Sequence, residues 1–161
     1  MLHIRPATET DIPEILKLIR ELAEYEKLAH YVVVTPEDLK RDGFSERPVF
    51  RVLMAEWDGE PAGYALYFYN YSTFLGRPGI FLEDLFVRPQ FRKKGIGKAL
   101  LLRLAKIAVE ERCARVDWIV LDWNTPALEF YKSLGAEVLK EWVTMRLSGE
   151  ALAKLAALAK D

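Results

Sequence analysis

Cysteine and histidine are scarce in this chain, which has one cysteine, Cys113, and two histidines, His3 and His30. A single cysteine cannot form an intrachain disulfide, so we expect a reducing compartment, the cytoplasm. So few thiol and imidazole groups cannot convincingly supply a Cys/His metal site or a histidine-based catalytic triad. We therefore expect chemistry that uses no metal and no covalent enzyme intermediate.

Long apolar runs and an excess of one charge are also missing. No run of roughly 18 apolar residues suggests a membrane span, and no charged-then-apolar leader suggests a signal peptide. The formal net charge of −1 argues against a general nucleic-acid binder. The length of 161 residues, with 51% hydrophobic and 29% charged residues, predicts one globular domain over residues 1–161.

Hydrophobic periodicity predicts an alternation of strands and helices. Capping signals at Thr35 and Asp38, and the hairpin signal Asp58-Gly59, mark two of the boundaries. We expect strands over residues 2–5, 50–57, 62–71, 80–87, 116–121 and 136–147, and helices over residues 12–25, from 36, 95–111, from 125 to about 134, and from 149. This order predicts an α/β protein with a mixed sheet.

The stretch from residue 79 to residue 104 organises the chain. A nearly continuous apolar strand, Ile80 to Val87, leads through a basic loop with two glycines into a helix. A helix N-terminus with free amide groups and glycines beside it is typical of a phosphate site. The P-loop pattern fails, because Arg92 stands in place of its first glycine and Ala99 in place of its hydroxyl residue. The dinucleotide pattern fails at Leu100.

The loop Arg92-Lys93-Lys94-Gly95-Ile96-Gly97 resembles the acetyl-CoA loop of the GNAT N-acetyltransferase superfamily, [QR]-x-x-G-x-[GA]. Leu82 to Val87, Trp123-Asn124 and Phe130-Tyr131-Lys132 are similar to the spermidine/spermine N-acetyltransferase branch of that superfamily. The resemblance spans roughly residues 3 to 147 and implies the GNAT fold.

The resemblance implies a set of acetyl-CoA-binding residues. The loop would hold the pyrophosphate, and the backbone of the preceding strand would pair with the pantetheine arm. The basic side chains of the loop are also compatible with a solvated surface. The full set is Leu85, Phe86, Val87, Arg92, Lys93, Lys94, Gly95, Ile96, Gly97, Lys98, Asn124, Pro126, Ala127 and Tyr131.

Two residues carry the catalytic roles that the resemblance implies. Tyr131 would give a proton to the leaving thiolate, although spacing alone favours a packed aromatic residue. Glu83 would help to deprotonate the amine, through water. Glu83 and Asp84 follow each other in a strand, and strand alternation predicts that they point to opposite faces. Both acids could also simply reach water at a strand end, and Asp84 fits a structural role, such as a bulge, as well.

The substrate residues follow from the same resemblance, and we place Tyr25, Glu26, Glu83, Asp84 and Trp118 among them. A carboxylate there would pair with a substrate ammonium. The chain departs from the branch at Val143 and Met145, where an acidic-Gly-Trp-Arg segment is expected, and at Thr73, where an aspartate is expected. Fewer acids weaken the case for a long polycation and favour a smaller amine or a thialysine-like amino acid.

We therefore predict an acetyl-CoA-dependent N-acetyltransferase that acts on a polyamine, a diamine or a thialysine-like amino acid by direct transfer in a ternary complex. The alternatives are a protein or peptide N-acetyltransferase and a non-catalytic acyl-CoA-binding regulatory module. We expect no nucleic-acid or membrane partner. The apolar C-terminal helix and the family resemblance both predict a homodimer.

Overall fold

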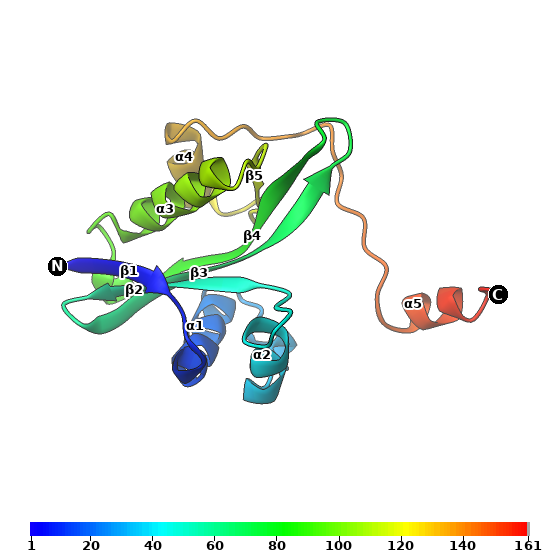
Figure 1. Cartoon of the computed structure of the whole chain (residues 1–161), viewed down its shortest axis with the longest axis horizontal. Coiled ribbons are helices and arrows are strands. Elements are labelled where there is room, and N and C mark those ends of the chain that lie inside the picture. Colours follow the sequence, from blue (N-terminus) through cyan, green and yellow to red (C-terminus); the bar gives the residue numbers. More distant parts are fainter. Residues whose placement is uncertain (161) are drawn as a thin grey trace. The chain divides into compact units, whose positions relative to one another are not determined.

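The computed structural model describes residues 1–160 and contains two compact units (Figure 1). The first unit is Met1–Leu121 and the second begins at Asp122, and each is described by itself. The first unit contains β1 (Leu2–Pro6), α1 (Ile12–Tyr25), α2 (Pro36–Gly43), β2 (Arg51–Trp57), β3 (Glu60–Ser72), β4 (Arg77–Val87), α3 (Ile96–Glu110) and β5 (Val116–Asp117). Short 3₁₀ turns cover Glu9–Asp11, Ala29–Tyr31 and Pro89–Phe91.

The five strands form one sheet in the order β1-β2-β3-β4-β5. The first four strands pair antiparallel, and β5 joins β4 in parallel. The parallel pair is possible because α3 carries the chain back across the sheet. The prediction of a mixed α/β sheet is confirmed.

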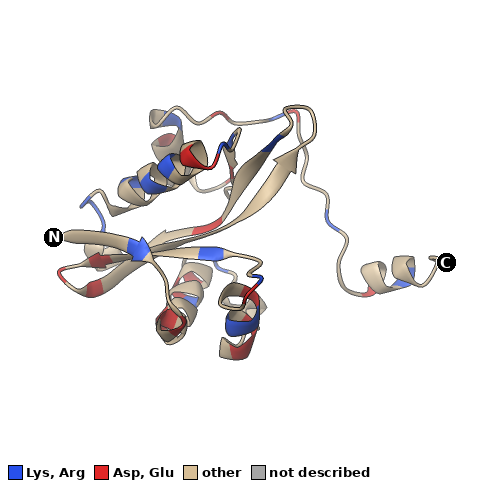
Figure 2. Cartoon of the chain, viewed as in Figure 1, with Lys and Arg blue, Asp and Glu red and all other residues tan. Residues whose placement is uncertain are grey.

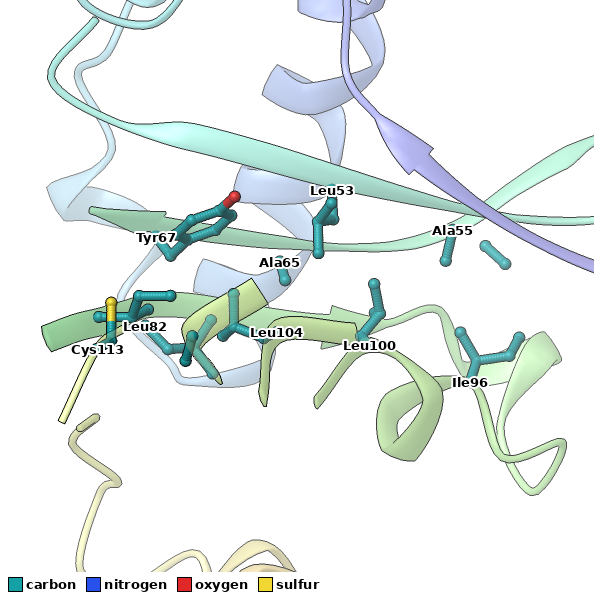
Figure 3. Close-up of a cluster of buried hydrophobic side chains, with 12 residues drawn as sticks. Leu53, Ala55, Ala65, Tyr67, Leu82, Ile96, Leu100, Leu104 and Cys113 are labelled. Carbon is teal, nitrogen blue, oxygen red and sulfur yellow. The ribbon is translucent and has the colours of Figure 1, made fainter. Parts of the chain in front are cut away.

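Helices cover both faces of this sheet, with α1 and α2 on one face and α3 on the other (Figure 1). The alternation of β3 explains this division, since Tyr64 and Leu66 pack towards α1 and α2, whereas Ala65 and Tyr67 pack towards α3. Figure 3 shows the cluster on the α3 face, where Leu100 and Leu104 of α3 pack with residues of β2, β3 and β4. Cys113, the one cysteine, is buried in this cluster.

Local sequence signals appear as expected in the first unit. The Thr35 hydroxyl accepts a hydrogen bond from the Asp38 N–H at 3.1 Å, and the Asp38 carboxylate accepts one from the Thr35 N–H at 3.0 Å. This capping box starts α2. Asp58 and Gly59 both have positive φ, 50° and 85°, which suits the tight hairpin between β2 and β3.

Two predicted strands differ from the structure. The strand expected over residues 116–121 is limited to β5, Val116–Asp117, which lies at the sheet edge and pairs only with Ile80 and Phe81. The prediction of a strand over residues 136–147 was wrong, because no strand is assigned to this segment. Its hydrophobic pattern suits a strand, but a strand forms only where its backbone groups pair with a neighbour.

The second unit contains two helices, α4 (Thr125–Ser133) and α5 (Gly149–Ala156). Asn124 caps α4, since its Oδ1 accepts a hydrogen bond from the Ala127 N–H at 3.4 Å, and Pro126 lies in the first turn. Ser148 occupies the N-cap position of α5 without a side-chain hydrogen bond. Within residues 1–160, no helix is both long and apolar enough to cross a membrane.

Candidate active site

The loop between β4 and α3 has the backbone of an anion site. Gly95 is the N-cap of α3, has a φ of 76°, and supplies no side-chain cap to the first turn. Lys93 also has a positive φ, 64°. A Cβ built on Gly95 would meet nothing within 4 Å, and one built on Gly97 would meet only Val87, at 3.8 Å. The amide groups of the first turn are therefore approachable, and the helix dipole favours an anion there.

The cations of this loop are partly held in place by aromatic rings. The Arg92 guanidinium lies 5.0 Å from the ring centroid of Tyr25 and 5.8 Å from that of Phe86, and Arg92 Nε donates to the Val87 carbonyl at 3.0 Å. Lys94 Nζ lies 4.8 Å from the ring centroid of Trp57. Figure 2 shows this basic loop at the start of α3. Such cation–π contacts orient the charges before any ligand arrives.

A bulge in β4 decides where the two acids of this strand point. Leu66 of β3 pairs with Asp84, but the next residue, Tyr67, pairs with Leu82, so Glu83 is the extra residue. The bulge shifts the alternation of side chains by one position. In a regular strand, Leu82 and Leu85 would point to opposite faces because they are three residues apart, yet both pack on the α3 face. Glu83 and Asp84 therefore both lie towards the α1 face. The prediction that they point to opposite faces was wrong, because strand alternation holds only in an unbroken ladder.

Three carboxylates gather on this face of the first unit. Burial first, and then the charge of Glu83, raise the pKa of Glu26, the residue that directly follows α1. Burial raises the pKa of Asp84 to about 6, and the charges of Glu83 and Glu26 add to this effect. A hydrogen bond from the Tyr64 hydroxyl to Asp84 Oδ2, 2.9 Å long, works in the opposite direction. The mutual repulsion is a reason to expect a cationic ligand here.

The basic loop and the carboxylates meet at the end of α1. Tyr25, the last residue of α1, contacts Arg92, and Glu26 follows it directly. Leu85 and Val87 pack on the α3 face, whereas Phe86 is buried towards α1. Trp118 follows β5 and packs against the cluster on the α3 face, opposite the carboxylates. Of the predicted substrate residues, the structure thus brings Tyr25, Glu26, Glu83 and Asp84 together and leaves Trp118 on the other face of the sheet.

The remaining predicted residues belong to α4 in the second unit. Asn124, Pro126 and Ala127 form its first turn. Tyr131 is half-buried near the end of α4, with its ring centroid 5.4 Å from that of Phe130. No group of three or more metal-ligating side chains was found within residues 1–160.

Two features of the site escaped the sequence reasoning. One is Tyr64, whose hydroxyl is the hydrogen-bond partner of Asp84. The aromatic composition of β3 was the available signal, but periodicity alone does not show which ring meets the acid. The other is the contact between Arg92 and Tyr25, residues that lie far apart in the sequence.

This arrangement of a mixed sheet and a basic glycine loop at a helix start agrees with the acyltransferase class that the sequence motifs suggest. The family model "Acetyltransferase (GNAT) family" matches residues 13–136. The chain therefore belongs to the GNAT acetyltransferase family and is an N-acetyltransferase.

Individual relatives agree with this membership. The chain is 45% identical to a thialysine N-ε-acetyltransferase of Bos taurus over 164 residues, which cover 95% of this chain and 96% of the bovine protein. It is 36% identical to an L-ornithine N5-acetyltransferase of Arabidopsis thaliana, covering 93% of this chain and 86% of that protein. Among solved structures, an integron cassette protein from Vibrio cholerae is similar, with a TM-score of 0.82, 30% identity, and coverage of 96% of this chain and 97% of that one.

Proposed function

We propose that this protein transfers the acetyl group of acetyl-CoA to a primary amine of a small cationic acceptor, a diamine or a thialysine-like amino acid. The observation that carries this proposal is the cluster of Glu26, which follows α1, with Glu83 and Asp84 of β4, the strand that leads into the basic loop. The names of the bovine and Arabidopsis relatives, which act on amino acids with a side-chain amine, support the same substrate class.

The loop residues fit acetyl-CoA as the co-substrate, which supplies an activated acetyl thioester. The amide groups at the start of α3, together with Arg92, Lys93, Lys94 and Lys98, would bind the pyrophosphate. Leu85 and Val87 would offer backbone groups to the pantetheine arm. The Val87 carbonyl accepts a hydrogen bond from Arg92 in this structure. Asn124, Pro126 and Ala127 would contribute from α4.

Direct transfer in a ternary complex requires two proton movements by the protein. An alkylammonium has a pKa of about 10.4, so Glu83 would take its proton, through water, to create the nucleophile. The amine nitrogen then bonds to the acetyl carbon, the carbon–sulfur bond breaks, and the nitrogen gives up its second proton, which balances the proton that the thiolate takes up. Tyr131 would give a proton to the departing thiolate, which is already a tolerable leaving group because a thiol has a pKa of about 8.5. Tyr25, Glu26 and Asp84 would bind the acceptor, whereas Trp118 lies on the α3 face and is not part of this group.

A panel of acceptors tests the proposed function. Release of free thiol from acetyl-CoA is measured with 1,4-diaminobutane, thialysine, lysine, n-butylamine and a peptide with a free N-terminal amine. We expect the first two to react with the highest kcat/KM. Preference for the peptide would instead indicate a protein N-acetyltransferase, and no thiol release with any amine would favour a regulatory acyl-CoA-binding protein.

Two glutamate variants should separate the roles of the carboxylates. Glu26→Gln should raise KM for 1,4-diaminobutane but spare n-butylamine, because only the diamine carries a distal charge. Glu83→Gln should lower kcat/KM for both acceptors by about 10- to 100-fold and move the pH profile upward, since spontaneous deprotonation must replace the base.

Glu24→Gln is the matched control for Glu26→Gln, because Glu24 is an exposed acid near the end of the same helix. It should leave both acceptors unaffected. Equal losses with the diamine and the monoamine in Glu26→Gln would exclude the distal-charge role.

We also propose that the protein is a homodimer. Several large apolar side chains of the second unit are strongly exposed, including Trp142 at 74%, Val143 at 78% and Met145 at 86%. They lie within residues 136–147, which have the hydrophobic pattern of a strand but pair with no strand in this structure. A second copy of the chain would cover these apolar side chains. Light scattering at micromolar concentration should give twice the chain mass of 18.5 kDa. A monomer mass would contradict the proposal.

A further inference from the structure

Tyr64 places a hydroxyl group inside the protein next to a carboxylate. Its side chain is fully buried between the sheet and α1, at 0% exposure, and its hydroxyl donates to Asp84 Oδ2 at 2.9 Å. The next tyrosine on β3, Tyr67, is also buried but packs on the α3 face. Of these two buried tyrosines, Tyr64 is therefore the one that lies on the same face of the sheet as the carboxylates.

Asp84 needs such a donor because its surroundings oppose its charge. Glu83 on β4 and Glu26 at the end of α1 both repel it, and burial withdraws it from water. Tyr64 on β3 is the group that counters these effects, through its hydrogen bond. The cation at this end of α1, Arg92, contacts the rings of Tyr25 and Phe86. A hydrogen bond to the charged form of a carboxyl group favours that form.

We propose that Tyr64 is a positioning residue for acceptor selection: by orienting Asp84 and keeping it ionised, it makes Asp84 the third carboxylate of the amine site and so favours acceptors with two positive charges. This inference rests on the proposed function, since it concerns the same amine site. It adds a residue that touches no acceptor and acts entirely through Asp84.

The test variant is Tyr64→Phe, which removes only the hydroxyl. The carboxyl carbon of Asp84 is followed by ¹³C NMR as pH changes, and KM for 1,4-diaminobutane is measured at pH 7 and pH 8.5. Loss of the hydrogen bond should raise the pKa of Asp84 from about 6 by roughly one unit or more. At pH 7 much of Asp84 is then protonated, so KM should rise by roughly two- to tenfold for a shift of one to two units.

The pH dependence distinguishes this role from a structural one. At pH 8.5 Asp84 is largely ionised in both proteins, so KM of the variant should return to within about twofold of the wild-type value. The kcat with saturating diamine should change by less than about twofold, because the reacting groups are intact. An increase in KM of the same size at both pH values would overturn the proposal.

Two further variants serve as controls. Tyr67→Phe, a buried tyrosine of the same strand on the opposite face, should alter neither the Asp84 titration nor KM. Asp84→Asn should raise KM for the diamine at both pH values, and adding Tyr64→Phe to it should have almost no further effect. A wild-type KM in Asp84→Asn, or a large further increase in the double variant, would overturn the inference.

These measurements separate a failure of the inference from a failure of the proposed function. Absence of thiol release from the wild-type protein with every amine would reject the proposed function. The NMR titration, and calorimetric binding of 1,4-diaminobutane to wild type and Tyr64→Phe, do not depend on turnover. An unchanged Asp84 titration or an unchanged diamine affinity at pH 7 would reject the role of Tyr64, even in an active enzyme.

Discussion

Replacing Tyr131 with Phe should lower kcat by about 10²- to 10⁴-fold, the usual cost of losing a positioned proton donor. The departing thiolate would have to leave without a proton from the protein. Affinity for acetyl-CoA should change little, because the Phe ring keeps the packing of Tyr131 against Phe130 in α4. The measurements are steady-state thiol release and calorimetric titration with acetyl-CoA.

Tyr71→Phe is a suitable control for this prediction, since Tyr71 is a tyrosine of β3 with 61% of its surface exposed. It should leave kcat unchanged. If Tyr131→Phe has a near wild-type kcat, Tyr131 is a packing residue and the proton donor must be sought elsewhere. A fall in kcat together with a large loss of acetyl-CoA affinity would assign Tyr131 to binding.

Replacing Gly95 with Glu should weaken acetyl-CoA binding by about a hundredfold or more. The new carboxylate would lie at the N-terminus of α3, where the pyrophosphate is expected, and like charges repel there. Calorimetric titration with acetyl-CoA measures the effect. Unchanged affinity would show that the loop does not bind the co-substrate.

Strain must be separated from charge in this experiment, because Gly95 has a φ of 76°, which disfavours any side chain. Gly95→Ala carries the same backbone strain without the charge, and a Cβ there meets nothing within 4 Å. We expect it to bind acetyl-CoA with only a small loss. Acetyl-pantetheine, which lacks the pyrophosphate, should be used equally well by Gly95→Glu and wild type.

Much of the fold is encoded in short stretches of sequence. The Thr35–Asp38 capping box and the Asp58-Gly59 hairpin depend on residues three positions apart or fewer, so their geometry follows from local backbone preferences. The strand, basic loop and helix around Gly95 also form a continuous segment. These signals, with the resemblance of the loop, were enough to predict a mixed sheet with its first four strands, the helices and the family.

The two wrong predictions, a strand over residues 136–147 and opposite faces for Glu83 and Asp84, both concern pairing between segments that lie far apart in the sequence. Residues 136–147 have the hydrophobic pattern of a strand, yet they form none, because pattern alone supplies no partner for the backbone. The bulge at Glu83 likewise depends on how β4 pairs with β3, since Leu66 and Tyr67 select Asp84 and Leu82 as partners. The hydrophobic periodicity of β3 and β4 does not indicate this change of register.

By itself, the sequence determined the chemistry available to this protein: a basic loop at a helix start, acids in the preceding strand and a tyrosine in a later helix. Only the tertiary structure decided that Glu83 and Asp84 share one face with Glu26, and that Tyr64 donates to Asp84. The physical reason is the range of the interactions. Caps and turns are set by neighbours in the chain, whereas the facing of a carboxylate and its hydrogen-bond donor are set by strand register across 20 residues.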